Sequence, residues 1–205
     1  MQRPNAKVIP VVNLTEFFRD QLHTALAKQH AEVKDQTEHY VVNLLTLYAR
    51  SDHLIAGMPP GRRLCPLATL LAAAVDAPTS VEREAALQKL GDVSLFVAGF
   101  FAHGFERRLI DVDYHVAMGG GAYSTLADRL SHGRRSTLSS VFAELAGKFQ
   151  LIVDALGEIA DSARNWSQRD VLRLYEIWLK TGSSRAQRLL RNLGVEATPV
   201  ALRAH

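Results

Sequence analysis

The feature that most constrains the fold is a helical repeat of apolar residues after Ser136. Apolar side chains recur there at intervals of three and four, which places them on one face of an α-helix. This spacing predicts a single helix of about 25 residues. No two stretches of the chain offer convincing strand partners for each other, so the sequence favours an all-α protein. The repeating positions are Val141, Leu145, Phe149, Ile152, Leu156 and Ile159.

Capping residues and prolines predict where other helices begin. Asn13 and Glu16 resemble a capping box, in which each end of the motif satisfies a free backbone amide, at the start of a helix over residues 14–30. Pro66 can occupy the first turn of a helix over residues 67–75, where no amide hydrogen is needed. The other predicted helices start at Thr37, at Ser80 and at Asn165 or Ser167, and a short one covers Arg185–Leu193 with Gly194 after it.

Residues 110–118 fit two patterns. Their apolar residues alternate as in a half-buried strand, but they also fit helical spacing. We favour a helix, because an isolated strand without a partner is not stable. The whole pattern then predicts one domain of about seven or eight helices over residues 14–194. An extended N-terminal arm is expected over residues 1–13 and a flexible tail over residues 195–205.

Composition narrows the class of protein. Of the 205 residues, 47% are hydrophobic, which is enough to build a core and too apolar for a disordered chain. The single cysteine, Cys65, excludes a disulfide framework and suits a reducing compartment. The longest nearly apolar run extends only from Val93 to Ala102, against the roughly 17 to 25 residues of a spanning helix. We therefore expect a cytoplasmic protein with no membrane span and no targeting signal.

Four side chains around Arg107 are candidate metal ligands. His103 and Glu106 are three residues apart, and Asp111 and His115 are four apart, so each pair could share a helix face. Two helices that meet near Arg107 would combine the pairs into an imidazole and carboxylate cluster suited to zinc or iron. The alternative is structural, because such groups more often cap helices or form ion pairs.

A candidate ligand pocket follows directly along the chain. Ionisable groups in an otherwise apolar segment tend to have shifted pKa values, which are enriched at functional sites. Three consecutive glycines could cradle an anion at a helix N-terminus or admit a ligand to the backbone, although they match neither the dinucleotide fingerprint nor the P-loop. Close packing of two helices is the alternative. The candidate ligand-binding residues are Asp113, His115, Gly119, Gly120, Gly121 and Tyr123.

The basic residues of the last predicted helix form a candidate partner surface. Arg185, Arg188 and Arg191 are three apart and line one face of that helix. A helix-turn-helix interpretation would put two of these arginines where a recognition helix should be apolar, and a net charge of +3 is modest for a DNA-binding protein. We therefore expect a solvated arginine stripe that could bind an acidic protein partner, and we do not expect nucleic-acid binding.

Two functions remain open from the sequence. No G-x-S-x-G motif or other complete catalytic set is present, which favours a binding protein over an enzyme. The leading hypothesis is a cytoplasmic all-helical binding protein with a regulatory or scaffold role, acting through a protein partner or a small ligand, and able to form a homodimer. The alternative is a helical enzyme or sensor with a polar, metal-loaded pocket around residues 103–123. The sequence identifies no cofactor.

Overall fold

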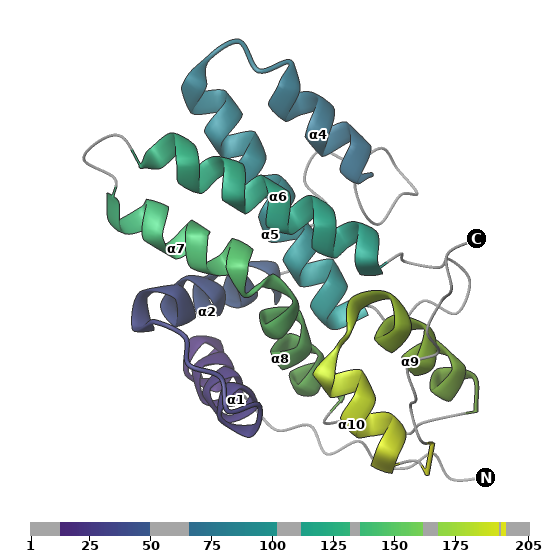
Figure 1. Ribbon diagram of the computed structural model, residues 1–205. Coiled ribbons are helices and arrows are strands. Elements are labelled where there is room, and N and C mark those ends of the chain that lie inside the picture. The colour runs from purple at the N-terminus through teal and green to yellow at the C-terminus, as the bar shows by residue number, and fades with distance from the viewer. Residues whose placement is uncertain are drawn as a thin grey trace, which may run out of the picture.

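A computed structural model describes residues 13–49, 66–101, 112–131, 136–161, 168–192 and 194–195. Within these ranges the chain forms nine α-helices and no strand, so the all-α prediction is confirmed (Figure 1). The helices are α1 (Leu14–Lys28), α2 (Asp35–Ala49), α4 (Leu67–Val75), α5 (Ser80–Phe101), α6 (Val112–Leu130), α7 (Ser136–Gly147), α8 (Phe149–Asp161), α9 (Gln168–Thr181) and α10 (Ser184–Asn192). The predicted arm, Cys65 and most of the predicted tail lie outside the described residues. No described helix combines the length and apolarity needed to cross a bilayer.

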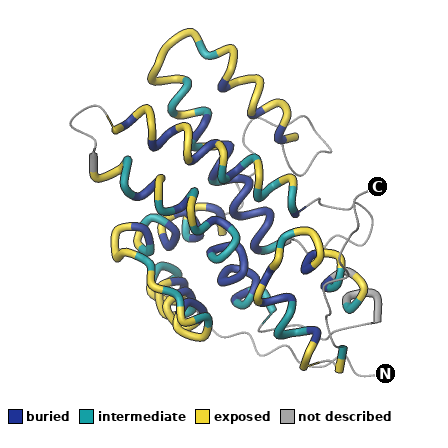
Figure 2. The backbone as a smooth tube through the Cα atoms, in the orientation of Figure 1, coloured by how far each residue is buried: buried dark blue, intermediate teal, exposed yellow. Residues whose placement is uncertain are grey.

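Helix α5 is the centre of the bundle. It packs against α4, α6, α8 and α2, while α1 contacts α8 and α10 contacts α9 and α8. The consecutive residues from Leu90 to Gly99 are buried except for the half-buried Asp92, and Figure 2 shows the dark interior continuing from α5 into α8. A helix buried on nearly all sides needs neighbours on all sides, and this arrangement supplies them.

Close packing of α6 against α5 and α8 depends on two glycines. A Cβ atom at Gly91 would lie 2.4 Å from Cε1 of Tyr123, and one at Gly119 would lie 2.3 Å from Cζ of Phe149. Both distances are far below van der Waals contact. The two glycines therefore let aromatic rings from neighbouring helices rest directly on the helix backbone.

The predicted helix of about 25 residues is in fact two helices, and that prediction is wrong. Helix α7 ends at Gly147 and α8 begins at Phe149, with Lys148 in a turn between them. The Lys148 ammonium donates to the carbonyl of Glu32 (2.6 Å) and to Glu144 (2.7 Å), which holds the turn against the α1–α2 connection. The break lets α7 pack on α6 while α8 turns towards α1 and α5.

The predicted cap of the second helix is also misplaced. Helix α2 begins at Asp35, and Thr37 lies inside its first turn, completely buried. The carbonyl of Lys34 accepts the first backbone hydrogen bonds, from the amides of Thr37 and Glu38. The capping oxygen comes instead from Glu144 on α7, to which the Lys34 amide donates at 3.3 Å.

Several helix boundaries are confirmed. Asn13 caps α1, where its side-chain oxygen accepts from the amides of Thr15 and Glu16. Residues 112–118 are helical, as favoured over the strand alternative. Gly194 follows α10 with φ of 80°, the left-handed conformation that terminates a helix.

Candidate functional site

The pocket predicted around residues 103–123 is only partly described. His103, Glu106 and Asp111 lie outside the described residues, so the metal cluster stays a prediction. In the described ranges, no group of three or more histidine, cysteine or acidic side chains is placed to hold a metal ion. Asp113 is half-buried, and its Oδ1 lies 3.6 Å from Nζ of Lys180 on α9, so it helps to join α6 to α9. His115 is half-buried on the same helix.

Tyr123 is separated from the other predicted pocket residues. It lies ten positions after Asp113 on α6, about 15 Å along the helix axis at ~1.5 Å per residue. Its side chain is fully buried against α5 and α7, and its hydroxyl donates to Asp92. The structure therefore does not bring Tyr123 to Asp113 or His115.

The three glycines lie in the interior of α6, so the predicted anion cradle at a helix N-terminus is wrong. Backbone amides in a helix interior already donate to the preceding turn. Gly119 serves close packing, because a Cβ there would also meet Cβ of Ser94 at 2.6 Å. Gly120 is in ordinary contact with its surroundings, while Gly121 is exposed and a Cβ there would meet no atom within 4 Å. Only the packing alternative for Gly119 is confirmed.

A polar cluster that the sequence analysis missed joins α2, α5 and α6. Oδ1 of Asp92 accepts from the hydroxyls of both Tyr40 and Tyr123, each at 2.6 Å. Nε2 of Gln88 donates to the Tyr40 hydroxyl at 3.0 Å. One available signal was the spacing of Glu84, Gln88 and Asp92, which puts a line of polar residues along one face of the predicted helix.

Burial dominates the electrostatics of this cluster. Desolvation raises the pKa of Asp92 to about 6, although the two tyrosine hydroxyls partly oppose the shift. Burial, together with the nearby Asp92 charge, also raises the pKa values of Tyr40, Tyr48 and Tyr123. The tyrosines therefore remain neutral hydrogen-bond donors, while Asp92 titrates close to neutral pH.

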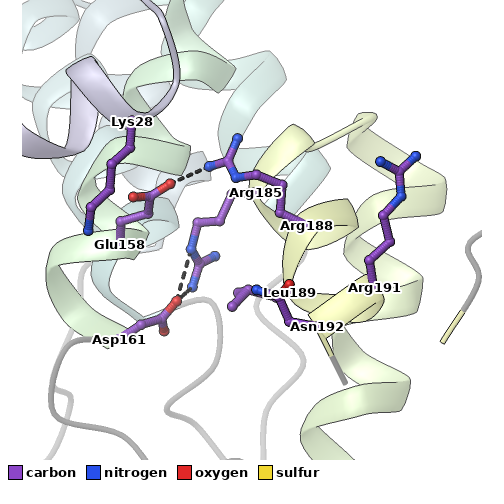
Figure 3. Close-up of a pocket in the computed structure, with 8 residues that line it drawn as sticks. All are labelled: Lys28, Glu158, Asp161, Arg185, Arg188, Leu189, Arg191 and Asn192. Atoms are coloured by element: carbon purple, nitrogen blue, oxygen red, sulfur yellow. Dashed lines mark hydrogen bonds and ion pairs between the residues drawn. The ribbon is translucent and has the colours of Figure 1, made fainter. Parts of the chain in front are cut away.

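A second polar region lies between α1, α8 and α10, and we call it the basic cleft. It has a volume of about 430 Å³ (Figure 3). Helix α1 supplies one basic side chain, α8 supplies two acidic ones and α10 supplies three arginines. The lining residues are Lys28, Glu158, Asp161, Arg185, Arg188, Leu189, Arg191 and Asn192.

Arg185 is the structural anchor of the basic cleft. Its side chain is only 4% exposed, and its Nε donates to Oδ2 of Asp161 at 3.0 Å. Gly157 makes room for the guanidinium, because a Cβ there would lie 2.6 Å from Cζ of Arg185. The prediction of a solvated stripe is therefore wrong for Arg185. Arg188, which is half-buried, pairs with Glu158, and Arg191 is exposed.

The start of α10 sets the position of these arginines. Asp154 on α8 is buried and accepts from the Ser183 hydroxyl (2.7 Å), the Arg185 amide (3.2 Å) and Nε2 of Gln150 (2.7 Å). Oγ of Ser183 in turn accepts from the Ala186 amide at 3.0 Å. A carboxylate at a helix N-terminus satisfies free amides and complements the helix dipole. Asp154 thus fixes α10 on α8, and the arginines follow from that attachment.

The charges of the basic cleft do not balance. Four basic side chains line it against two acidic ones, which leaves an excess of two positive charges. Both acidic side chains are already paired, Asp161 with Arg185 and Glu158 with Arg188. Lys28 and Arg191 are exposed, and neither pairs with an acidic side chain in the part of the chain that the structure describes. The arrangement can attract and hold an anionic group.

Comparison of this chain with protein-family models, with curated proteins and with solved structures gives no match.

Proposed function

We propose that this chain is a non-enzymatic binding protein with a regulatory or scaffold role, and that it captures an acidic segment of a protein partner in the basic cleft. The single observation that carries the proposal is that this cleft has two more basic than acidic side chains, while both acidic side chains are already in ion pairs. A cytoplasmic location is part of the same proposal.

The support comes from preorganisation. Arg185 and Arg188 are held by Asp161 and Glu158, so a partner does not have to order them. Preorganised groups lower the entropy cost of binding. The exposed Lys28 and Arg191 then supply attraction at longer range, which accelerates association with an acidic partner.

The shape of the basic cleft favours a protein segment over a duplex. Its cations come from α1 and α10, and two of them pair with the two carboxylates of α8, as Figure 3 shows. Duplex binding usually needs an extended basic surface that follows phosphates along a groove. A short stretch of aspartate or glutamate side chains matches the local charge pattern better.

The test measures binding of a fluorescent peptide rich in glutamate and aspartate to the full chain by anisotropy. We expect saturable binding that weakens as salt is added, because exposed charges are screened. The double variant Lys28→Glu/Arg191→Glu should lose most of this binding, since it reverses both unpaired charges without touching the two ion pairs.

A matched control separates local from global charge. Lys89→Glu/Arg129→Glu makes the same change in net charge at exposed positions of α5 and α6 that do not line the basic cleft. This control should bind the peptide almost as well as the wild type. Equal loss in both double variants would reject the cleft as the binding site, and stronger binding of a DNA duplex than of the peptide would reject the partner class.

A further inference from the structure

A second pocket, which we call the α5–α7 pocket, lies away from the basic cleft. It has a volume of about 220 Å³ between the N-terminal half of α5, the C-terminal end of α6 and the N-terminal half of α7, with Tyr40 from α2. Leu126, Leu130 and Phe142 are buried and form an apolar wall. At its edge, the Val81 side chain is 65% exposed and that of Leu138 is 46% exposed. An apolar ligand would cover surface that the fold itself leaves in water.

The polar end of this pocket is oriented by the tyrosine cluster. The Tyr40 hydroxyl donates to Asp92 and accepts from Nε2 of Gln88. The Gln88 amide group is therefore held in one orientation. Its carbonyl oxygen has no hydrogen-bond partner among the described residues and is not sealed from solvent. Gln88 thus presents a fixed acceptor to a ligand that brings a donor.

The electrostatic environment favours a cation. Glu84, which also lines the pocket, and Asp92, which lies behind Tyr40, share one face of α5 with Gln88. Among the described residues that line the pocket, none is basic. Two aromatic rings also line it, those of Tyr40 and Phe142, with centroids 5.3 Å apart and an angle of 79° between their planes. Aromatic rings beside carboxylates are a typical environment for an ammonium group.

We propose that the α5–α7 pocket binds a small amine whose ammonium group donates to the Gln88 carbonyl and whose aliphatic ring lies on Leu126, Leu130 and Phe142. The pocket volume of about 220 Å³ is large enough for a single six-membered ring with one substituent. This site is independent of the basic cleft, and failure of either proposal leaves the other standing.

The test compares three probes that share one ring. Cyclohexylamine in its ammonium form, cyclohexanol and cyclohexanecarboxylate are titrated into the isotope-labelled full chain, and NMR shifts are followed at residues around the pocket. We expect saturable shifts with the ammonium probe, weaker binding of the alcohol and no saturable binding of the carboxylate. Equal binding of the ammonium and the carboxylate, or no saturable binding of any probe at millimolar concentration, would overturn the proposal.

Substitutions that fill or charge the α5–α7 pocket test whether the ammonium probe binds there. Ala85 is exposed and lines the pocket, so Ala85→Trp should fill the cavity and abolish binding, while Ser124→Trp adds the same bulk at an exposed position outside it. If Ala85→Trp fails to fold, Leu138→Lys replaces it, because a positive charge at the edge should repel the ammonium probe. Binding of the ammonium probe that survives in the folded variant would overturn the proposal.

Removing the Glu84 charge tests whether the pocket recognises an ammonium group. Glu84→Gln should weaken the ammonium probe several-fold and leave the alcohol unchanged, since only the charged probe gains from the carboxylate. Glu32→Gln, at an exposed position away from the pocket, should change neither affinity. An equal loss for both probes in Glu84→Gln would show that the carboxylate does not recognise charge, and would overturn the amine as the ligand class.

Discussion

Asp92 and Glu144 both connect α2 to the rest of the bundle, yet their electrostatics are opposite. Asp92 on α5 accepts from two neutral hydroxyls, those of Tyr40 and Tyr123. Glu144 on α7 accepts from the Lys34 amide (3.3 Å), the Thr37 hydroxyl (2.6 Å) and the Lys148 ammonium (2.7 Å). Desolvation alone would raise the pKa of both carboxyls.

Whether the pKa rises or falls depends on the hydrogen-bond donors and on the depth of burial, which is greater for Asp92. The pKa of Glu144 is lowered, because hydrogen bonds from Lys148, Thr37 and the Lys34 amide together outweigh desolvation. The pKa of Asp92 is raised from 3.8 to about 6, because two neutral hydroxyls do not offset its burial. A positive charge and a backbone amide thus offset the smaller desolvation of Glu144, whereas two phenol groups do not offset the deeper burial of Asp92.

The two sites therefore respond to pH in opposite directions. The folded state binds the Asp92 proton more tightly than the unfolded chain, so this contribution to stability is fully present below about pH 4 and is lost as pH rises through about 6. The Glu144 contribution is present above its ordinary pKa of 4.5 and is lost as pH falls through its lowered value.

Removing the Glu144 carboxylate should cause the largest loss in the free energy of unfolding. Glu144→Ala leaves the buried Thr37 hydroxyl and the Lys34 amide without their acceptor, and we expect a loss of about 3 kcal/mol in the free energy of unfolding at neutral pH. Urea denaturation measures it. Glu32→Ala is the control, because Glu32 is an exposed glutamate in the connection between α1 and α2. This variant should change the free energy of unfolding little. Equal losses would mean that Glu144 contributes no more than a surface charge.

Displacing the Tyr123 ring should cause the second-largest loss in the free energy of unfolding. In Gly91→Ala the new methyl group would collide with the Tyr123 ring, and we expect a loss of about 2 kcal/mol from overpacking. Gly121→Ala on α6 is the matched control, because that position faces open space and alanine favours a helix. Denaturation of both variants checks the difference. A stable Gly91→Ala protein would show that the cluster tolerates movement of Tyr123.

Removing the Tyr40 hydroxyl tests how the phenol groups affect the pKa of Asp92. Tyr40→Phe deletes a hydrogen bond that lowers the pKa of Asp92, so the pKa of that carboxyl should rise further above 6. Stability should fall by about 1 kcal/mol at neutral pH, the usual value of one hydrogen bond. NMR titration of the Asp92 carboxyl carbon gives the pKa directly. A lower pKa in the variant would contradict the role assigned to Tyr40.

The smallest change at neutral pH is expected from Asp92→Asn. The amide oxygen can still accept both tyrosine hydroxyls, and the variant no longer buries a charge, so stability should stay within about 1 kcal/mol of the wild type. Its stability should also lose the decline that the wild type shows between about pH 4 and pH 7. An unchanged pH profile, measured by denaturation at several pH values, would remove Asp92 from this explanation.

The sequence predicted which residues face the core better than it predicted what those residues contact. Helical spacing placed Val141, Leu145 and Leu156 inside, and all three are buried. Spacing did not reveal the break at Lys148, where the side chain contacts Glu32, 116 residues away. The same limit explains the misplaced cap at Thr37, whose carboxylate partner comes from α7.

Two predicted side-chain environments were wrong for a related reason. Tyr123 was predicted to bind a ligand, but its hydroxyl donates to Asp92 on another helix. Arg185 was predicted to be solvated, but Asp161 pairs with it and Gly157 leaves space for it. Helical spacing assigns a residue to a face without saying which helix covers that face. Pairing across helices decides whether a polar side chain is buried.

The residues that line the basic cleft come from distant parts of the sequence, and this determines when the cleft can form during synthesis. Lys28 comes from α1, while Arg185 and Arg191 come from α10, which is synthesised much later. During synthesis, a nascent chain can assemble the cleft only after α10 has left the ribosome and docked on Asp154. A partner bound there would therefore select chains in which α1, α8 and α10 have assembled, and its binding energy would add to their resistance to proteolysis.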